Sequence, residues 1–177
     1  MGGAIGFGDF TPAAEFNFFC DPDAAQMVFQ SGIENIVLIP LEVTNTVLST
    51  KAVLKRIQDG IAVSKFSTFA TEVLRVFGDT FSYIHDEKDG YPLQDPVAVA
   101  YLVMPHAFVK KHIHVSVECS PGDGNGRSYC DLFNRLKRTS NCWIATSVDV
   151  DLFWNEMTDA LVKASTNSPW ADSLYNI

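Results

Sequence analysis

The spacing of apolar and polar positions along the chain predicts alternating strands and helices. The run "NIVLIPLEV" (35–43) is mostly apolar and β-branched, which is typical of a strand buried on both faces of a parallel sheet. Apolar residues recur at three-four spacing across 63–84, which predicts a long amphipathic helix, and a shorter one is predicted over 151–165. Residues 108–119 alternate and 141–150 has strand composition. We therefore expect an α/β fold, with sites where strands end in loops.

Polar residues mark the starts of three further helices. Asp21 precedes a proline and an apolar run, which predicts an N-cap. Ser49 or Thr50 opens the helix in "LSTKAVLKRIQDG". Asp95, in "GYPLQDPVAVAY", stands where a cap would open the helix 95–104. The same carboxylate could also bind a metal ion or a sugar, so its role stays open on this basis.

The first twenty residues are rich in glycine and predict a loop that leads into a short extended piece. In an extended chain, Glu15 and Asn17 point the same way because they flank Phe16. A carboxylate and an amide that lie together can hold sugar hydroxyls.

The charge of the chain is acidic, with a formal net charge of −8. A nucleic-acid-binding protein normally carries a basic stripe, so this class is not expected. The densest basic group, at 135–138, is short and is interpreted as a solvated loop or strand edge.

The four cysteines show no CxxC spacing and have no paired histidines nearby, which argues against zinc. We expect free thiols in a reducing compartment. The first residues lack the basic start and apolar stretch of a signal peptide, and the longest apolar runs are too short to cross a bilayer. A cytoplasmic protein without a membrane partner is therefore expected.

The remaining titratable residues name no reaction by themselves. His112 and His114 have the spacing of one strand face, but no third metal ligand is close in sequence. His85 lies in a polar stretch, where a substrate-facing role remains open. The acidic pairs in "DPD" (21–23) and "DVD" (149–151) each precede a helix, which favours capping over metal binding.

Three motifs carry a resemblance to a known family. The run "MGGA…GDFTPAAEFNFFCDPDAAQMVF", the segment "VLIPLEVTN" and the segment "QDPVAVAY" resemble the nucleoside N-ribohydrolases, the inosine-uridine preferring nucleoside hydrolases. The resemblance implies a Rossmann-like, open and mostly parallel sheet with flanking helices. It also implies that residues 1–177 form the C-terminal part of a single nucleoside hydrolase domain.

The resemblance implies hydrolysis of the N-glycosidic bond between ribose and a purine or pyrimidine base, as in nucleoside salvage. In this family a calcium ion and an aspartate activate the attacking water, and the transition state resembles an oxocarbenium ion. A ribonucleoside is therefore the expected substrate and Ca²⁺ the expected cofactor.

The family motifs assign roles to several residues of this sequence. Glu15 matches the glutamate that binds the ribose 5′-hydroxyl, and Asn17 the asparagine that contacts ribose. Met1 matches the methionine at the edge of the ribose pocket. Asp95 matches an aspartate that binds calcium and ribose, and Asp9 stands where an asparagine usually contacts the 5′-hydroxyl.

The sequence also departs from the family pattern. The aspartate cluster D-x-D-x-x-x-D-D, which supplies the catalytic base and most metal ligands, is absent, as is the threonine that offers a carbonyl ligand. Gln94 replaces the histidine that commonly precedes the aspartate, and glutamine cannot act as a general acid. Asn45 replaces the last residue of the usual "VTH".

Two hypotheses follow about the function. In the first, the chain is part of a nucleoside hydrolase and is inactive without the remaining part. In the alternative, it is a truncated, non-catalytic remnant that binds nucleosides or acts as an interaction domain. Apolar strand faces left open in either case predict an isolated chain that forms homo-oligomers, aggregates or is poorly stable.

Overall fold

A computed structural model describes residues 1–61, 64–85 and 90–169 of the chain, with the backbone alone for 81–85. The chain divides into two compact units. Unit 1 comprises Met1–Thr46 and Gln94–Asp149, and unit 2 comprises Val47–Leu93 and Val150–Ile177.

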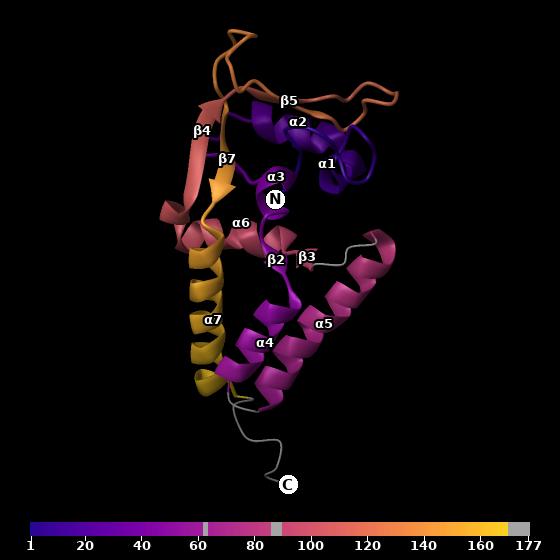
Figure 1. Ribbon diagram of the computed structural model, residues 1–177. Coiled ribbons are helices and arrows are strands. Elements are labelled where there is room, and N and C mark those ends of the chain that lie inside the picture. The colour runs from indigo at the N-terminus through magenta and orange to yellow at the C-terminus, as the bar shows by residue number, and fades with distance from the viewer. Residues whose placement is uncertain (62–63, 86–89, 170–177) are drawn as a thin grey trace. The chain divides into compact units, whose positions relative to one another are not determined.

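Unit 1 contains a mixed sheet with short helices around it (Figure 1). Its elements in chain order are α1 (Phe16–Cys20), α2 (Pro22–Gln30), β1 (Val37–Leu38), α3 (Leu41–Thr44), α6 (Gln94–Val103), the 3-10 helix η1 (Pro105–Ala107), β4 (Phe108–Ile113), β5 (Val115–Val117), β6 (Ser128–Cys130) and β7 (Cys142–Val148).

The main sheet has the strand order β1-β7-β4. β1 runs parallel to β7, with Val37 opposite Trp143, whereas β4 runs antiparallel to β7, with His112 also opposite Trp143. β5 and β6 pair with each other as a separate antiparallel hairpin. The central strand β7 thus lies between two strands that come from distant parts of the sequence.

The strand predicted over 35–43 is wrong in its length. Only Val37 and Leu38 form β1, and the chain then turns at Pro40 into α3. Proline has no N–H to donate to a ladder, and Pro40 stands at the N-cap of α3 in an extended conformation. The apolar residues after it are buried by a helical turn instead of a strand.

The extended piece predicted around Glu15 is also wrong. Residues 16–20 form the helix α1, and Glu15 is its N-cap. Asn17 is therefore the second residue of a helix, so the two side chains do not share a strand face. Glutamate is not among the common N-cap residues, but the Glu15 side chain accepts from the N–H groups of Asn17 and Phe18.

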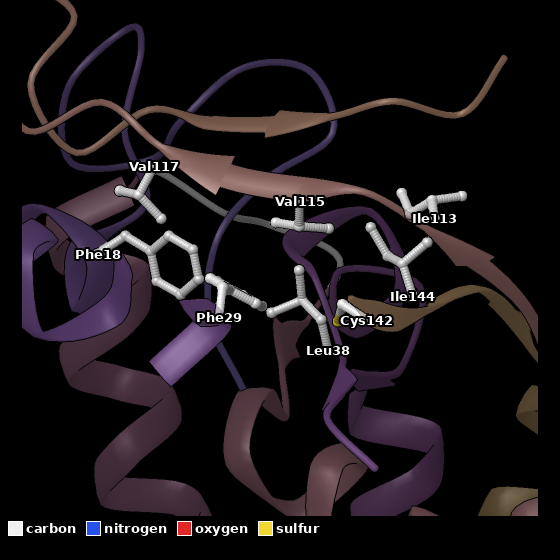
Figure 2. Close-up of a cluster of buried hydrophobic side chains, with 8 residues drawn as sticks. All are labelled: Phe18, Phe29, Leu38, Ile113, Val115, Val117, Cys142 and Ile144. Atoms are coloured by element: carbon white, nitrogen blue, oxygen red, sulfur yellow. The ribbon is translucent and has the colours of Figure 1, made fainter. Parts of the chain in front are cut away.

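The core of unit 1 forms where α1 and α2 pack on one face of the strands (Figure 2). Figure 2 shows eight buried side chains in this cluster: Phe18, Phe29, Leu38, Ile113, Val115, Val117, Cys142 and Ile144. Phe18 and Phe29 meet edge to face, with ring centroids 6.0 Å apart. This packing anchors the beginning of the chain to the sheet.

Unit 2 is mostly helical. Its elements are β2 (Leu48–Ser49), α4 (Lys51–Gly60), α5 (Lys65–His85), β3 (Tyr91–Pro92) and α7 (Val150–Asn167). α4 contacts both α5 and α7, and β2 pairs antiparallel with β3 (Figure 1). Gly78 permits a close approach, because a Cβ at this position would lie 2.1 Å from the Tyr91 ring.

Most helix predictions are confirmed. Asp21 caps α2 by accepting from the Ala24 N–H, and Thr50 caps α4 by accepting from the Val53 N–H. The long helix and the closing helix are both present. Asp95, however, is not the N-cap of α6, which begins at Gln94, so its carboxylate lies in the first turn.

Other expectations have mixed outcomes. The basic group at 135–138 lies in an exposed loop, as expected. The side chain of His85 and residues 86–89 of the polar stretch that follows it lie outside the described residues. No helix in the described part of the chain is long and apolar enough to cross a membrane.

All four cysteines are free thiols. Burial raises the pKa of Cys130 to about 12 and that of Cys142 to about 11. Both thiols therefore stay protonated at mildly alkaline pH, and a protonated thiol is a poor nucleophile.

The four cysteines should differ in their rates of alkylation. With iodoacetamide at about pH 8.5, we expect the exposed Cys20 to react first and Cys130 and Cys142 last. Peptide mass spectrometry over time measures the order. In urea all four should react at similar rates, and rapid labelling of Cys142 in the native chain would contradict the packing of the core.

Candidate functional site

The first three residues lie beside the segment that links β1 to α3. The Gly2 N–H donates to the Ile39 carbonyl at 3.2 Å, and the Leu41 N–H donates to the Gly3 carbonyl at 3.1 Å. The two segments run parallel, because Gly3 bonds to a residue further along the second segment than Gly2 does. Met1 is thereby placed at the end of β1, where the sequence prediction expected sites.

The Glu15 carboxylate holds this arrangement together. Its Oε2 accepts from the N–H groups of Gly3 at 2.8 Å and Phe18 at 3.1 Å, and its Oε1 accepts from the Asn17 N–H at 2.7 Å. The side chain is 2% exposed. A buried carboxylate needs such donors, and a carboxylate offers about four acceptor positions, so three of them are filled by backbone groups.

Gly3 makes this contact possible. Its φ of +65° lies in the left-handed region, and a Cβ would lie 2.9 Å from the ring of Phe18. The backbone can therefore pass between the aromatic ring and the carboxylate only because there is no side chain.

Three further side chains hold the glycine-rich loop through contacts that the sequence did not indicate. Glu42 accepts from the N–H groups of Ile5 and Gly6, Ser128 bonds to both backbone groups of Ala4, and Asp9 accepts from the Phe16 N–H. The partners of Glu42 and Ser128 are 36 or more residues away, so no local pattern could indicate them.

Met1 and Asn17, two of the expected ribose-contacting residues, lie together. The Asn17 side-chain Nδ2 lies 3.3 Å from the Met1 sulfur. Asn17 is exposed. Met1 also lines an open hollow of about 410 Å³ between β1 and α6.

A second group forms at the start of α6. The Thr44 hydroxyl donates to the Gln94 Oε1 at 2.6 Å, and the Gln94 Nε2 lies 3.4 Å from the Asn45 Oδ1. The end of α3 and the start of α6 are therefore joined through side chains 50 residues apart in sequence. Asp95 is exposed beside them, and no hydrogen bond to its carboxylate is found within the described ranges.

The described residues do not form a calcium site on their own. Calcium takes six to eight oxygen ligands, usually from several carboxylates. No group of three or more His, Cys, Asp or Glu side chains that could hold a metal ion occurs in the part of the chain that the structure describes. Asp95 therefore offers one carboxylate and lacks the others.

The two histidines considered as a metal pair make other contacts. His112 stacks on the ring of Trp143, with centroids 4.7 Å apart, and His114 lies between β4 and β5 with its Nδ1 2.9 Å from the Thr139 carbonyl. The two histidines thus make separate contacts, and neither belongs to a group of three possible metal ligands within the described residues.

Comparison with known proteins identifies the family. The sequence profile of the inosine-uridine preferring nucleoside hydrolases matches residues 1–155. The chain belongs to this family. The probable ribonucleoside hydrolase of Dictyostelium discoideum is 36% identical over 168 residues, which are 91% of this chain and 48% of that protein.

Further nucleoside hydrolase relatives agree. The putative pyrimidine-specific ribonucleoside hydrolase RihB of Shigella boydii is 35% identical and covers 87% of this chain and 62% of its own length. The solved structure of the purine-preferring ribonucleoside hydrolase from Gardnerella vaginalis aligns with a TM-score of 0.80 and 28% identity, over 92% of this chain and 51% of that one. This nucleoside hydrolase fold confirms the expected α/β class, and the chain spans less than two thirds of each relative.

The Glu15 carboxylate should carry a measurable part of the stability. Glu15→Gln replaces one acceptor oxygen with an N–H₂ group that faces backbone donors, so we expect a loss of about 1–3 kcal/mol in the free energy of unfolding. Urea denaturation followed by circular dichroism measures it. Asp9→Asn, at an exposed carboxylate with one backbone donor, is the matched control and should cost less. Equal losses would refute the central role of Glu15.

Proposed function

We propose that this chain forms the ribose-recognition part of a nucleoside hydrolase, an enzyme that cleaves the N-glycosidic bond of ribonucleosides. The observation that carries the proposal is the placement of Met1 with Asn17 at the end of β1, in a chain that matches the family profile over residues 1–155. Relatives named as purine-preferring and pyrimidine-specific hydrolases support the ribonucleoside class and leave the base open.

Asn17 is the residue best placed to bind a ribose hydroxyl. Its amide is exposed, and it can both donate and accept a hydrogen bond. α1 fixes its backbone, and Glu15 fixes the start of α1. The Met1 side chain lies against the same amide and would form an apolar wall beside the sugar.

Glu15 acts in this proposal mainly as a positioning residue. Three of its acceptor positions are filled by backbone N–H groups, so at most about one remains for a hydroxyl. Its charge orients Gly3 and the first turn of α1, and through them Met1 and Asn17. Asp9 supports the same loop from its exposed side.

Gln94 would orient a ligand without protonating it. Thr44 donates to its side-chain oxygen, which leaves the amide N–H₂ directed toward Asn45 and solvent. An amide donates a hydrogen bond but cannot release a proton at neutral pH. Gln94 would therefore not protonate the departing base, and any proton that the base needs would come from elsewhere. Asp95 beside it would supply one of the oxygen ligands for calcium.

The isolated chain is expected to be inactive, because it lacks the aspartate cluster that would activate water. When the 177-residue chain is assayed with inosine or with uridine in the presence of Ca²⁺, it should release no base above the uncatalysed rate. The Gardnerella relative, assayed in parallel with purine ribonucleosides, is the positive control. Turnover comparable to that enzyme would show that the chain is catalytic by itself.

Ribose recognition can be tested separately from turnover. Inosine should perturb the NMR signal of the Asn17 side-chain amide, and Asn17→Ala should remove most of the inosine binding. Ser120, an exposed residue remote in sequence, provides the control Ser120→Ala. Equal binding by both variants would place the ligand elsewhere and refute the assigned ribose site.

A further inference from the structure

β4 is the outer strand of the main sheet (Figure 1). Within the described ranges it pairs with β7 on one side, and no strand pairs with Phe108–Ile113 on the other. An unpaired strand edge presents N–H and C=O groups to which a further extended segment can bond. The edge of β4 can therefore accept another strand through main-chain hydrogen bonds.

The register of β4 and β7 shows which backbone groups face the open side. The Trp143 N–H is bonded on the β1 side of β7. The next residue, Ile144, therefore directs its backbone groups toward β4, where Lys111 lies opposite. Lys110 and His112 flank Lys111, so their N–H groups point to the open side.

Basic side chains border this edge on both faces of the sheet. Lys110 and His112 lie on one face, where the Lys110 ammonium is 4.9 Å from the Trp143 ring centroid and His112 stacks on the same ring at 4.7 Å. Lys111, between them in sequence, points to the other face, where its ammonium lies 5.8 Å from the Phe133 ring centroid. An added strand would therefore meet a lysine on whichever face its side chains lie.

The loop between β6 and β7, which contains Phe133, adds three more cations. The Asp131 carboxylate accepts from the N–H groups of Arg135 at 2.7 Å and Leu136 at 2.8 Å, which folds this loop into a turn. Arg135, Lys137 and Arg138 are exposed. The carboxylate at the start of the loop is thus bonded to the backbone, while the cationic groups face solvent.

These five cations, Lys110, Lys111, Arg135, Lys137 and Arg138, form a basic patch on an acidic chain. They are five of its 13 lysines and arginines, whereas its formal net charge is −8. In the part of the chain that the structure describes, the ion pairs join residues within α4 or within α5, and none includes a patch residue. Cations without ion-pair partners favour a ligand that supplies negative charge.

We propose that the basic patch and the open edge of β4 bind an acidic, extended segment of another protein. The segment adds to β4 as a strand, bonds to the N–H groups of Lys110 and His112, and directs carboxylates toward Lys110 on one face and Lys111 on the other. A membrane surface or a nucleic acid could match the charge, but only a polypeptide matches the spacing of the main-chain groups. The proposal does not depend on the ribose site.

A second copy of this chain fits the edge poorly. None of the described strands contains an aspartate or a glutamate. Two copies of β4 placed side by side would bring their lysines together, and like charges on paired strands are unfavourable. Lysines commonly protect an edge strand from pairing with its own kind in this way. The same lysines attract a strand that carries carboxylates.

Fluorescence polarisation with the 177-residue chain tests the proposal. The probe is a fluorescein-labelled peptide of about eight residues in which glutamate alternates with valine, long enough to cover the six residues of β4. We expect saturable binding that weakens as salt is added. A peptide with glutamine in place of glutamate should bind at least about tenfold more weakly, because it lacks the charges. A fully N-methylated peptide keeps the charges but cannot donate main-chain hydrogen bonds, and it should also lose about tenfold or more.

Each control has an outcome that overturns the proposal. Equal binding of the glutamine peptide would refute charge complementarity, and equal binding of the N-methylated peptide would refute strand addition. Phosphatidylserine vesicles and a single-stranded oligonucleotide are tested in the same buffer. Tighter binding of either one than of the acidic peptide would show that the partner is not a polypeptide. A homodimer, detected by light scattering, that excludes the peptide would place a second copy on the edge.

Matched charge reversals locate the binding surface. The double variant Lys110→Glu, Lys111→Glu should weaken peptide binding at least about tenfold. The double variant Lys65→Glu, Lys163→Glu changes the net charge equally, at two exposed lysines on α5 and α7 of unit 2, and should leave the affinity within about twofold. Circular dichroism checks that both variants fold. Equal weakening by the two would show attraction by the overall charge and refute the assigned surface.

Hydrogen–deuterium exchange tests the edge without any substitution. The amides of Lys110 and His112 should exchange more slowly when the acidic peptide is bound, because each gains an acceptor on the open side. Binding that leaves the exchange of both amides unchanged would place the peptide on another surface and overturn the proposal.

Discussion

The arrangement of the candidate site depends on one buried carboxylate. Glu15 accepts three backbone N–H groups, one from the beginning of the chain and two from the first turn of α1. Without those donors a buried carboxylate would be very unfavourable, and without the carboxylate three N–H groups would lack an acceptor. Each therefore requires the other, and this requirement sets the position of Gly3 relative to α1.

The same contact links the core to the surface. Phe18 packs in the central cluster while its N–H binds Glu15, and Asn17, one residue earlier, is exposed. One helical turn thus has one side in the core and the other in solvent. A rigid core contact on one side positions a polar side chain on the other, as a binding site requires.

The described residues assemble two polar groups but no cluster of carboxylates. Two groups with the right residue types are assembled, around Asn17 and around Gln94, both on unit 1. The described residues do not bring several carboxylates together at either group. Binding a sugar needs a few directed hydrogen bonds, whereas activating water through calcium needs a set of negative oxygen ligands. In the proposed function, the chain's own residues perform the first task.

By itself, the sequence determined the features that depend on neighbouring residues. Asp21 and Thr50 cap their helices through N–H groups within three residues, and the apolar period of α5 spans one continuous segment. The family motifs, which are also continuous, indicated the α/β fold and the residues of the candidate site.

Only the tertiary structure decided how those residues are used. The length of β1 depends on Pro40 and on what buries the residues after it, and the Glu15 carboxylate bonds to Gly3, twelve residues away, in addition to capping α1. Gln94 meets Thr44 across 50 residues. Such contacts arise from packing of distant segments, and no local spacing encodes them. The sequence predicted Glu15 and Asn17 as ribose ligands on an extended segment, whereas the structure has Glu15 as the N-cap of α1 and Asn17 as an exposed amide in its first turn.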